Sequence, residues 1–284
     1  MKRNTPFFIL LSLLVCLVGC NKDPQPTPPD SPVTLLSTTE RNNSNGRVVE
    51  ACYSDSTRWY FRLLSDSTAE VTSYRLFYDD GDDSQAWVYR GEVTIPEQFE
   101  HQGTTYKVNA IGSYAFGAYL ETMTSTWYAP SLVTAVTIPN TVTSIQECAF
   151  LACASLESVN IPNTVLSIPN NCFADCQKLQ SVTLPNTLLS IGDQAFVDCL
   201  SLVSFEIPES VCQLGFALFE GCTALKTLTC RPTTPPGKYE GWYYEGPFLF
   251  PESLESIAVP SAALDAYKND ANWSPYAGLM VGIN

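Results

Sequence analysis

The sequence predicts a mainly β solenoid with short helices, because one pattern recurs four times between Val133 and Cys230 at a spacing of 23 residues. A constant period in this range is typical of stacked repeats, in which each unit buries its apolar side against its neighbours. Each unit opens with β-branched residues that alternate with short polar ones and then meets a proline, which favours a strand that ends there. The inward positions of this strand are Val133, Leu156, Leu179, Leu202 and Leu225, then Val136, Val159, Val182, Phe205 and Leu228, then Ile138, Ile161, Leu184, Ile207 and Cys230.

A second apolar segment and a helical turn complete each unit. Beyond the proline, residues such as Val165 and Ile168 predict another short strand. A phenylalanine then recurs three residues before a cysteine, and this spacing places ring and sulfur on the same inward side of a helical turn. The pairs are Phe150 with Cys153, Phe173 with Cys176, Phe196 with Cys199, and Phe219 with Cys222. We therefore expect each rung to run strand, turn, strand, short helix.

The repeated blocks resemble the BspA-type leucine-rich-repeat family of bacterial surface proteins. The residues that carry the resemblance are the L-x-S-V-x-I-P-N-T-V-x-S-I block and the A-F-x-x-C-x-x-L block, of which Ala195 to Leu202 is an instance. The resemblance covers most of the chain after Gly91. It implies a curved leucine-rich-repeat solenoid used for recognition, frequently adhesion to host or matrix proteins, and no catalytic centre.

The first residues predict export and lipid anchoring. Residues 1–19 combine a basic start with an apolar run, and Leu17-Val18-Gly19-Cys20 fits a lipobox, so we interpret them as a lipoprotein signal peptide. The alternative is an ordinary signal peptide with an accidental cysteine. Cleavage before Cys20 would leave that residue lipidated and would anchor the chain to a membrane. Asn21-Lys22-Asp23 resembles signals that send some Bacteroidetes lipoproteins to the outer leaflet, so we expect an outer-membrane lipoprotein that faces the cell surface.

Two further segments precede the repeats. Residues 20–45 are rich in proline and short polar residues, which predicts a disordered tether behind the lipidated cysteine. Residues 46–91 lack the period and predict a β cap over the first rung, with strands at 59–64, 71–78 and 86–89. The acidic run Asp79–Asp83 could be interpreted as a calcium site, but its spacing lacks the distant glutamate of a calcium loop, and Asp-Gly favours a hairpin turn.

The repeats themselves are expected over residues 92–230, and a closing rung with a helical cap over 231–284. Glu92–Phe116 resembles the family's entry rung, interrupted by a hairpin loop at His101–Gly103. The closing segment resembles the family's helix with a following tryptophan, so that Ser261 would cap a short helix and Trp273 would seal the last rung.

Two aromatic stretches leave alternatives open. The inserted loop around Trp127 and Tyr128 could form an anchor surface for a partner or could cover the adjacent rung. The same two interpretations apply to Trp242, Tyr243 and Tyr244 near the closing rung.

Eleven cysteines in an exported chain call for interpretation. Equivalent side chains of stacked rungs lie parallel, so we predict that the four cysteines of the Phe–Cys pairs form a buried thiol ladder of small apolar groups. Whether Cys148 and Cys172 form a disulfide stays open. A zinc site from Cys148, Cys153, Cys172 and Cys176 would need convergent sulfur atoms, which a ladder does not supply. We predict neither a metal nor a cofactor.

Charge and residue content argue against nucleic-acid binding and catalysis. The formal net charge of -14 becomes -16 without residues 1–19, which hold two basic residues and no acidic one, and such a surface repels nucleic acid and anionic lipid. His101 is the only histidine, in a polar loop with no evident partner. Glu157 and Glu206 fall two rungs apart on an open sheet. We therefore predict no catalytic residue.

Two functions remain. The first is recognition of a protein or glycan of unknown identity, with the membrane contacted only through the lipid anchor. The second is a structural or accessory subunit of an outer-membrane or periplasmic envelope complex. For the first function we predict a binding stripe that runs across the strands and consists of Thr134, Glu157, Gln180, Val203 and Lys226 together with Thr137, Asn160, Thr183, Glu206 and Thr229.

Overall fold

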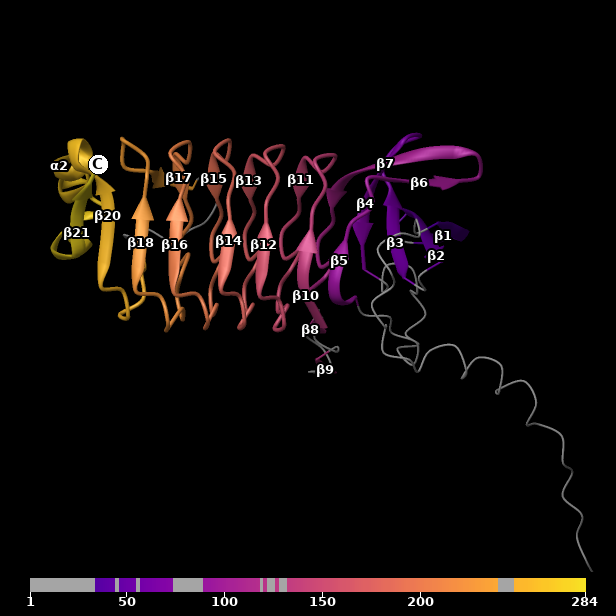
Figure 1. The fold of residues 1–284 in the computed structure, drawn as a ribbon, viewed down its shortest axis with the longest axis horizontal. Coiled ribbons are helices and arrows are strands. Elements are labelled where there is room, and N and C mark those ends of the chain that lie inside the picture. The colour runs from indigo at the N-terminus through magenta and orange to yellow at the C-terminus, as the bar shows by residue number, and fades with distance from the viewer. Residues whose placement is uncertain are drawn as a thin grey trace, which may run out of the picture.

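The chain folds into an elongated stack of rungs with a β-sheet at its N-terminal end and a helical segment at its C-terminal end (Figure 1). The computed structural model describes residues 34–43, 46–54, 57–73, 89–117, 120–121, 126–127, 132–239 and 248–284. These residues are mainly β, as predicted, with helical elements only near the C-terminus of the described part.

The N-terminal sheet begins as an antiparallel meander and continues into the repeats. It has the order β1-β2-β3-β4-β7-β11, with β6 pairing to β7. Strand β4 pairs in parallel with β7, and β7 pairs in parallel with β11 of the first full rung. One sheet thus joins the predicted β cap to the solenoid. Its strands are β1 (Leu35–Asn43), β2 (Gly46–Tyr53), β3 (Arg58–Leu63), β4 (Thr68–Thr72), β6 (Gln98–His101), β7 (Thr104–Ile111) and β11 (Ser144–Ile145).

Strand β1 corrects the predicted tether. The prediction of a disordered segment over 20–45 is wrong for Leu35–Asn43, which pairs along its length with β2. The polar sequence of β1 has no apolar alternation, so the pairing partner and not the local pattern fixes it as a strand. Strand β2 was likewise not among the predicted strands. Of the strand predicted at 71–78, residues 71 and 72 belong to β4, which begins at Thr68, and residues 74–78 are not described. Residues 74–88, with the Asp79–Asp83 run, and residues 1–33, with Cys20, lie outside the described residues.

The solenoid presents two faces of short parallel strands, here called the front sheet and the back sheet. Figure 1 shows the front strands as a row in the foreground and the back strands behind them. The front strands are β5 (Arg90–Thr94), β10 (Leu132–Thr137), β12 (Ser158–Asn160), β14 (Ser181–Thr183), β16 (Ser204–Ile207), β18 (Thr227–Cys230), β20 (Ser256–Pro260) and β21 (Met280–Ile283). The back strands are β7 and β11 together with β13 (Ser167–Ile168), β15 (Ser190–Ile191), β17 (Gln213–Leu214) and β19 (Gly237–Lys238).

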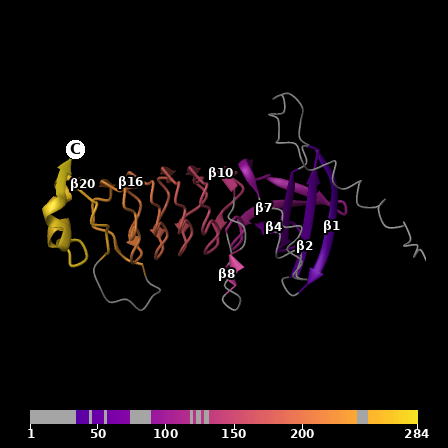
Figure 2. The ribbon, with the colours of Figure 1, turned by 90° about the horizontal axis from the view of Figure 1, so that it is seen from below.

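The prolines turn the chain between the two faces, as predicted. The carbonyls of Pro139, Pro162, Pro185 and Pro208 each accept a hydrogen bond from the amide three residues later. Strands β8 (Leu120–Glu121) and β9 (Thr126–Trp127) form a separate hairpin that projects from the stack near β10 (Figure 2).

The predicted short helix of each rung is a run of turns instead. In the described rungs two residues per rung, four positions apart, adopt a positive φ. A left-handed residue cannot continue a right-handed helix, so each one redirects the chain. These residues are Cys148 and Ala152, Asn171 and Asp175, Gln194 and Asp198, and Ala217 and Gly221. Of these residues only Gly221 adopts a positive φ without the steric cost of a side chain. Its missing Cβ also leaves room for the carboxylate of Asp198.

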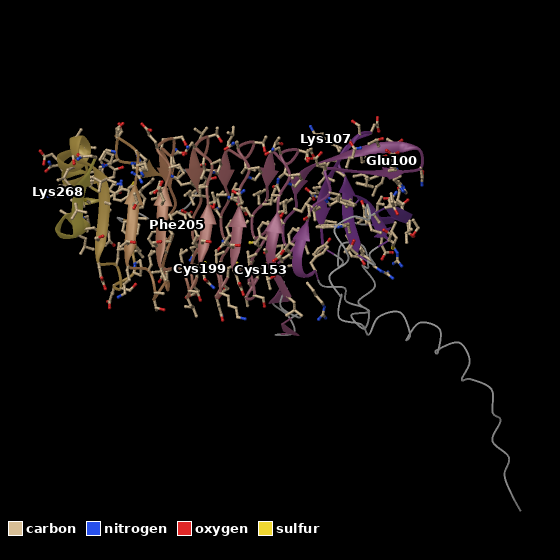
Figure 3. The ribbon with its side chains drawn as sticks, viewed as in Figure 1. Glu100, Lys107, Cys153, Cys199, Phe205 and Lys268 are labelled. Atoms are coloured by element: carbon tan, nitrogen blue, oxygen red, sulfur yellow. The ribbon has the colours of Figure 1, made fainter. Side chains whose placement is uncertain are left out.

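Two inward ladders hold the rungs together. The rings of Phe116, Phe150, Phe173 and Phe196 stack with centroid separations of 5.0, 5.0 and 5.4 Å. The predicted thiol ladder is present, since Cys153, Cys176, Cys199 and Cys222 are all fully buried; Cys153 and Cys199 are labelled in Figure 3.

Each ladder thiol also donates a hydrogen bond to a phenylalanine carbonyl of the preceding rung, which the sequence did not indicate. The sulfur–oxygen distances are 3.3 Å from Cys153 to Phe116, 3.2 Å from Cys176 to Phe150, 3.3 Å from Cys199 to Phe173 and 3.0 Å from Cys222 to Phe196.

Both ends of the stack are closed by aromatic side chains. At the N-terminal end Trp59 and Tyr89 pack on Phe116, with centroids 6.2 and 4.9 Å away. At the other end Trp273 is fully buried and donates an indole hydrogen bond of 3.0 Å to the carbonyl of Pro236, so it seals the last rung as predicted. The helical segment there consists of η2 (Ser261–Ala263), α2 (Leu264–Asn269) and η3 (Ser274–Leu279). The capping role predicted for Ser261 is wrong, because Ser261 is the first residue of η2 and no side chain caps that helix.

Candidate functional site on the front sheet

The alternation of the front strands decides which side chains reach solvent. Val159 and Ile161 are each 3% exposed and point into the core, so their neighbours Ser158 and Asn160 point outward. Successive rungs are in register, with Thr137 beside Asn160 and Asn160 beside Thr183. Equivalent side chains therefore form straight columns across the strands, about 4.8 Å apart.

The members of the predicted stripe are accessible to different degrees. Thr134 and Thr229 are half-buried. The other eight are exposed, namely Glu157, Gln180, Val203, Lys226, Thr137, Asn160, Thr183 and Glu206. The column from Glu157 to Lys226 lies immediately before the strands and not on them, because β12 starts at Ser158 and β18 at Thr227.

The sequence analysis missed one outward column. Strict alternation about the inward residues Val159, Val182, Phe205 and Leu228 would have found it, because the residue before each must face outward. This column consists of Ser158, Ser181, Ser204 and Thr227, all of them exposed. The front sheet thus presents hydroxyl and amide groups at its centre and charged groups at its margins.

Ion pairs engage two basic side chains of this face. Lys226 contacts Glu255 at 2.8 Å, and Arg231 contacts Glu206 at 3.1 Å. All four side chains are exposed, so these pairs contribute little to stability. Among the described residues Glu157 has no ion-pair partner.

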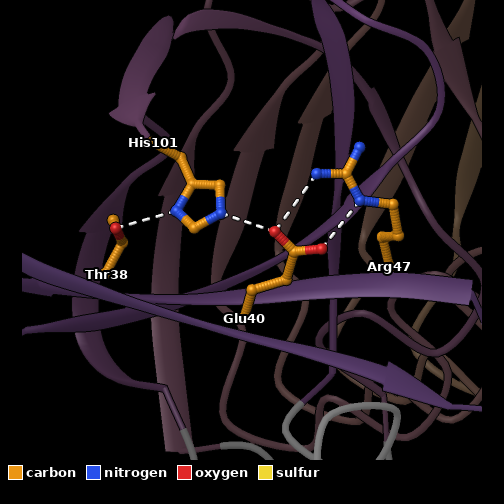
Figure 4. Close-up of polar contacts among 4 residues, drawn as sticks. All are labelled: Thr38, Glu40, Arg47 and His101. Atoms are coloured by element: carbon orange, nitrogen blue, oxygen red, sulfur yellow. Dashed lines mark hydrogen bonds and ion pairs between the residues drawn. The ribbon is translucent and has the colours of Figure 1, made fainter. Parts of the chain in front are cut away.

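A polar network in the N-terminal sheet involves the only histidine (Figure 4). His101 Nε2 lies 2.7 Å from a carboxylate oxygen of Glu40, and Nδ1 lies 2.8 Å from the hydroxyl of Thr38. Arg47 donates hydrogen bonds to both oxygens of the same carboxylate, at 2.7 and 3.1 Å. The expectation that His101 has no partner is wrong, because both partners come from β1, a strand that the sequence did not reveal.

The network has the carboxylate, imidazole and hydroxyl of a nucleophilic triad, but its setting favours a structural role. The imidazole is only 3% exposed and both of its nitrogen atoms are engaged, whereas a catalytic base must reach a substrate. Hydrogen bonds from Arg47, and secondarily from His101, lower the pKa of Glu40 from 4.5 to about 2. The contacts join β1 to the β6–β7 hairpin.

A comparison with known families identifies the repeats. Residues 121–235 match the model described as the BspA type Leucine rich repeat region, in six copies. The repeat region is a BspA-type leucine-rich repeat. The match begins after the predicted entry rung at 92–116, but β5 of that rung pairs in parallel with β10, so the front sheet continues into it.

Solved structures with a similar fold come from several bacteria. A leucine-rich repeat protein from Bacteroides ovatus ATCC 8483 is 26% identical over 72% of this chain and 54% of its own length, with a TM-score of 0.45. The leucine-rich repeat protein TpLRR of T. pallidum is 22% identical over 60% of this chain and 68% of its own, with a TM-score of 0.47. A leucine rich cell surface protein from Faecalibacterium prausnitzii A2-165 is 21% identical over 82% of this chain and 72% of its own, with a TM-score of 0.33.

The extent of these matches is limited in two ways. This chain spans about half the length of the Bacteroides ovatus protein, at 54%. None of the curated proteins matches it. No enzyme is named by the family model or by the structures above.

The remaining predicted sites can be placed relative to the BspA-type stack. Cys148 and Cys172 are free thiols, so the disulfide left open by the sequence is not formed. Burial raises the pKa of both, and that of Cys172 well above its usual value. Within the described residues no three histidine, cysteine or acidic side chains are grouped so as to hold a metal ion.

The aromatic candidates are only partly described. Trp127 lies in β9, paired with Leu120 of β8, whereas Tyr128, Trp242, Tyr243 and Tyr244 lie outside the described residues. No helix in the described part of the chain has the length and apolar content needed to cross a membrane.

Proposed function

We propose that this chain is a non-enzymatic cell-surface lipoprotein whose front sheet recognises a host or matrix protein or a glycan. The observation that carries the proposal is the exposure of the front sheet, whose strands pair in register from β10 to β14. Eight of the ten predicted stripe residues are exposed to solvent there, as is the column of Ser158, Ser181, Ser204 and Thr227. Regular columns of short polar groups on a flat sheet suit contact with an extended ligand.

The core beneath this surface favours binding without large rearrangement. The buried phenylalanine and thiol ladders fix each rung to the next. A surface that is already ordered loses little conformational entropy on binding, and more of the contact energy therefore contributes to affinity.

The anchor supports the cellular part of the proposal. A lipidated Cys20 would hold the chain at a membrane, and the residues up to about 33 would separate it from the described domain. Export to the outer leaflet would then present the front sheet to partners outside the cell. Under the alternative, the same anchor would hold the chain within an envelope complex.

The proposal is tested in two steps on intact cells. External protease should digest the native protein, and a Cys20→Ala variant should be lost from the membrane fraction. Protection that ends only when the outer membrane is permeabilised would refute surface display and favour the envelope subunit.

The second step tests the front sheet itself. The double variant Glu157→Lys with Glu206→Lys should abolish capture of immobilised matrix proteins or glycans. A control variant, Glu220→Lys with Glu252→Lys, changes net charge equally at exposed positions outside the front strands and should bind normally. Equal capture by both variants would show that the stripe is not the binding surface.

A further inference from the structure

The hydrogen-bonded ladder of the front sheet is interrupted at one place. Among the described residues the front strands divide into the sheet β5-β10-β12-β14 and the sheet β16-β18-β20-β21, with no ladder between β14 and β16. The same two rungs stay joined elsewhere, since Gly215 donates to Ile191 at 2.7 Å and Gln194 donates to Phe216 at 2.9 Å. The opening is therefore local to the front sheet.

A larger inward side chain, Phe205, stands at the interruption. In the three preceding rungs the equivalent inward position holds Val136, Val159 and Val182, which are much smaller. The Phe205 ring, labelled in Figure 3, lies 4.9 Å from Phe196 and 4.8 Å from Phe219. It wedges against both, and the separation of those two rings rises to 5.9 Å.

The interruption exposes part of the core. Val182 of β14 is partly exposed, and so is Leu184, the residue that follows this strand. Their equivalents in the preceding rung, Val159 and Ile161, are each only 3% exposed. In the next rung Val203, the one apolar member of the stripe, is 56% exposed. Three aliphatic side chains of these two rungs thus reach solvent.

The back sheet shows that an interruption alone does not open the core. Its ladder is also broken, between β11 and β13, yet Ile145 is 6% and Ile168 0% exposed there. Main-chain hydrogen bonds just beyond the break, from Cys148 to Asn170 and from Phe150 to Cys172, keep those rungs closed. Val93 of β5 is also partly exposed, but β5 is the terminal strand of its sheet; among the described front strands that lie between two others, only β14 has partly exposed inward residues.

The charges around the opening define what would bind. Arg231 is paired with Glu206 and Lys226 with Glu255, while Glu157 has no ion-pair partner among the described residues. Glu157 therefore offers an unpaired carboxylate to a basic ligand.

We propose that the opening formed by Val182, Leu184 and Val203 is an anchor site for an extended protein segment that presents one aliphatic side chain flanked by lysine or arginine. This inference rests on the proposed function and narrows its ligand from protein or glycan to protein. The aliphatic side chain covers the exposed core residues, and its basic neighbours contact the acidic margins. No aromatic residue stands in the outward positions of the described front strands to stack on a sugar ring.

The probe for this site is a fluorescein-labelled peptide of alternating threonine and lysine with one central leucine, followed by fluorescence anisotropy with the full exported chain. We expect saturable binding that weakens about tenfold when the peptide leucine becomes serine, and by a similar factor in Val203→Ser. The matched control Leu189→Ser removes an aliphatic side chain of 47% exposure immediately before back strand β15 and should bind normally.

A second variant tests the cause of the opening. Phe205→Val restores the residue type of the other rungs, so the ladder should close, amide hydrogen exchange at Thr183 and Glu206 should slow, and peptide binding should weaken about tenfold. If Phe205→Val fails to fold, Val203→Ser still tests the anchor site, because Val203 is a surface residue whose replacement should not disturb folding.

The outcomes separate the inference from the proposed function. Absence of peptide binding, equal affinity of Val203→Ser and the native chain, or equal loss in Leu189→Ser would overturn the anchor site. If Glu157→Lys with Glu206→Lys abolishes ligand capture while Val203→Ser and Phe205→Val retain it, the stripe stands and the anchor site falls. If none of these variants changes capture, both fall. A neutral oligosaccharide could also bind more strongly than the peptide and lose this binding in Val203→Ser and Phe205→Val. That result would overturn the choice of a protein ligand.

Discussion

Replacing a central ring of the phenylalanine ladder tests whether the stack is rigid. Phe173 is fully buried, with Phe150 at 5.0 Å on one side and Phe196 at 5.4 Å on the other. Truncation to alanine removes the buried ring and leaves a cavity, which typically costs about 3–5 kcal/mol. Collapse of the cavity would recover part of this loss.

The structure places the expected loss in the upper part of that range. Main-chain hydrogen bonds of 2.9 Å from Phe150 to Cys172 and from Phe173 to Ala195 fix the rungs on both sides of the ring. The neighbouring rings therefore cannot move into the space, and we expect Phe173→Ala to lower the free energy of unfolding by about 4–5 kcal/mol.

Equilibrium unfolding in urea, followed by tyrosine and tryptophan fluorescence, measures this loss. The control Leu189→Ala, at an exposed position immediately before back strand β15, should change the free energy of unfolding by less than about 0.5 kcal/mol. The slope of the unfolding free energy against urea concentration should be the same in the native chain and the variants, so that a shift in the midpoint concentration alone reports the change in stability. A loss below about 2 kcal/mol in Phe173→Ala would refute the rigid stack, because it would mean that adjacent rungs close over the cavity.

Three further predictions concern charge, backbone and thiols. The pKa of Glu40 is lowered to about 2, so the ionised carboxylate stabilises the folded chain fully above the unfolded value of 4.5, and this contribution is lost as pH falls through 2. Between pH 5 and 2 the thermal unfolding temperature should therefore fall more steeply for the native chain than for Glu40→Gln. Ala152 has a φ of 56°, so Ala152→Gly should stabilise the chain by about 1 kcal/mol in urea unfolding. Maleimide labelling of the native chain should modify the exposed Cys212 first and the four buried ladder cysteines only on unfolding, as measured by mass spectrometry.

Each of these predictions has an outcome that contradicts it. Parallel pH profiles for the native chain and Glu40→Gln would show that the ion pair does not couple to folding. Ala154→Gly, at a position outside the left-handed region, should not stabilise the chain, and equal gains at Ala152 and Ala154 would refute the backbone argument. Labelling of Cys176 at the rate of Cys212 would show that the rungs open readily.

The period of the sequence predicted the rung because the information is local and repeated. Inward residues such as Val159 and Ile161, the proline that follows them, and the Phe173–Cys176 pair all lie where the pattern indicates. The turn segment departed from the prediction at the left-handed residues, for example Ala152 and Ala217. Alanine favours helix locally, so only the hydrogen bonds between rungs, such as that from Ala152 to Ala174 at 2.7 Å, hold it in this conformation.

The candidate site was predicted only in outline. Alternation places Asn160 and Thr183 on the front sheet correctly, but the column that includes Glu157 lies before the strands, and the column that includes Ser158 was missed. The partners of His101 could not be predicted, because Thr38 and Glu40 lie about sixty positions away in a strand without apolar alternation.

The sequence by itself determined the architecture, since a 23-residue period with fixed inward positions permits only a stack of like units. Tertiary structure decided where the stack deviates from its own repeat. The strand β1, the contacts of His101 and the opening beside Phe205 all depend on residues from different rungs or sheets. The physical reason is that a repeat pattern records the contacts common to every rung, whereas these features arise from packing between residues that the pattern does not relate.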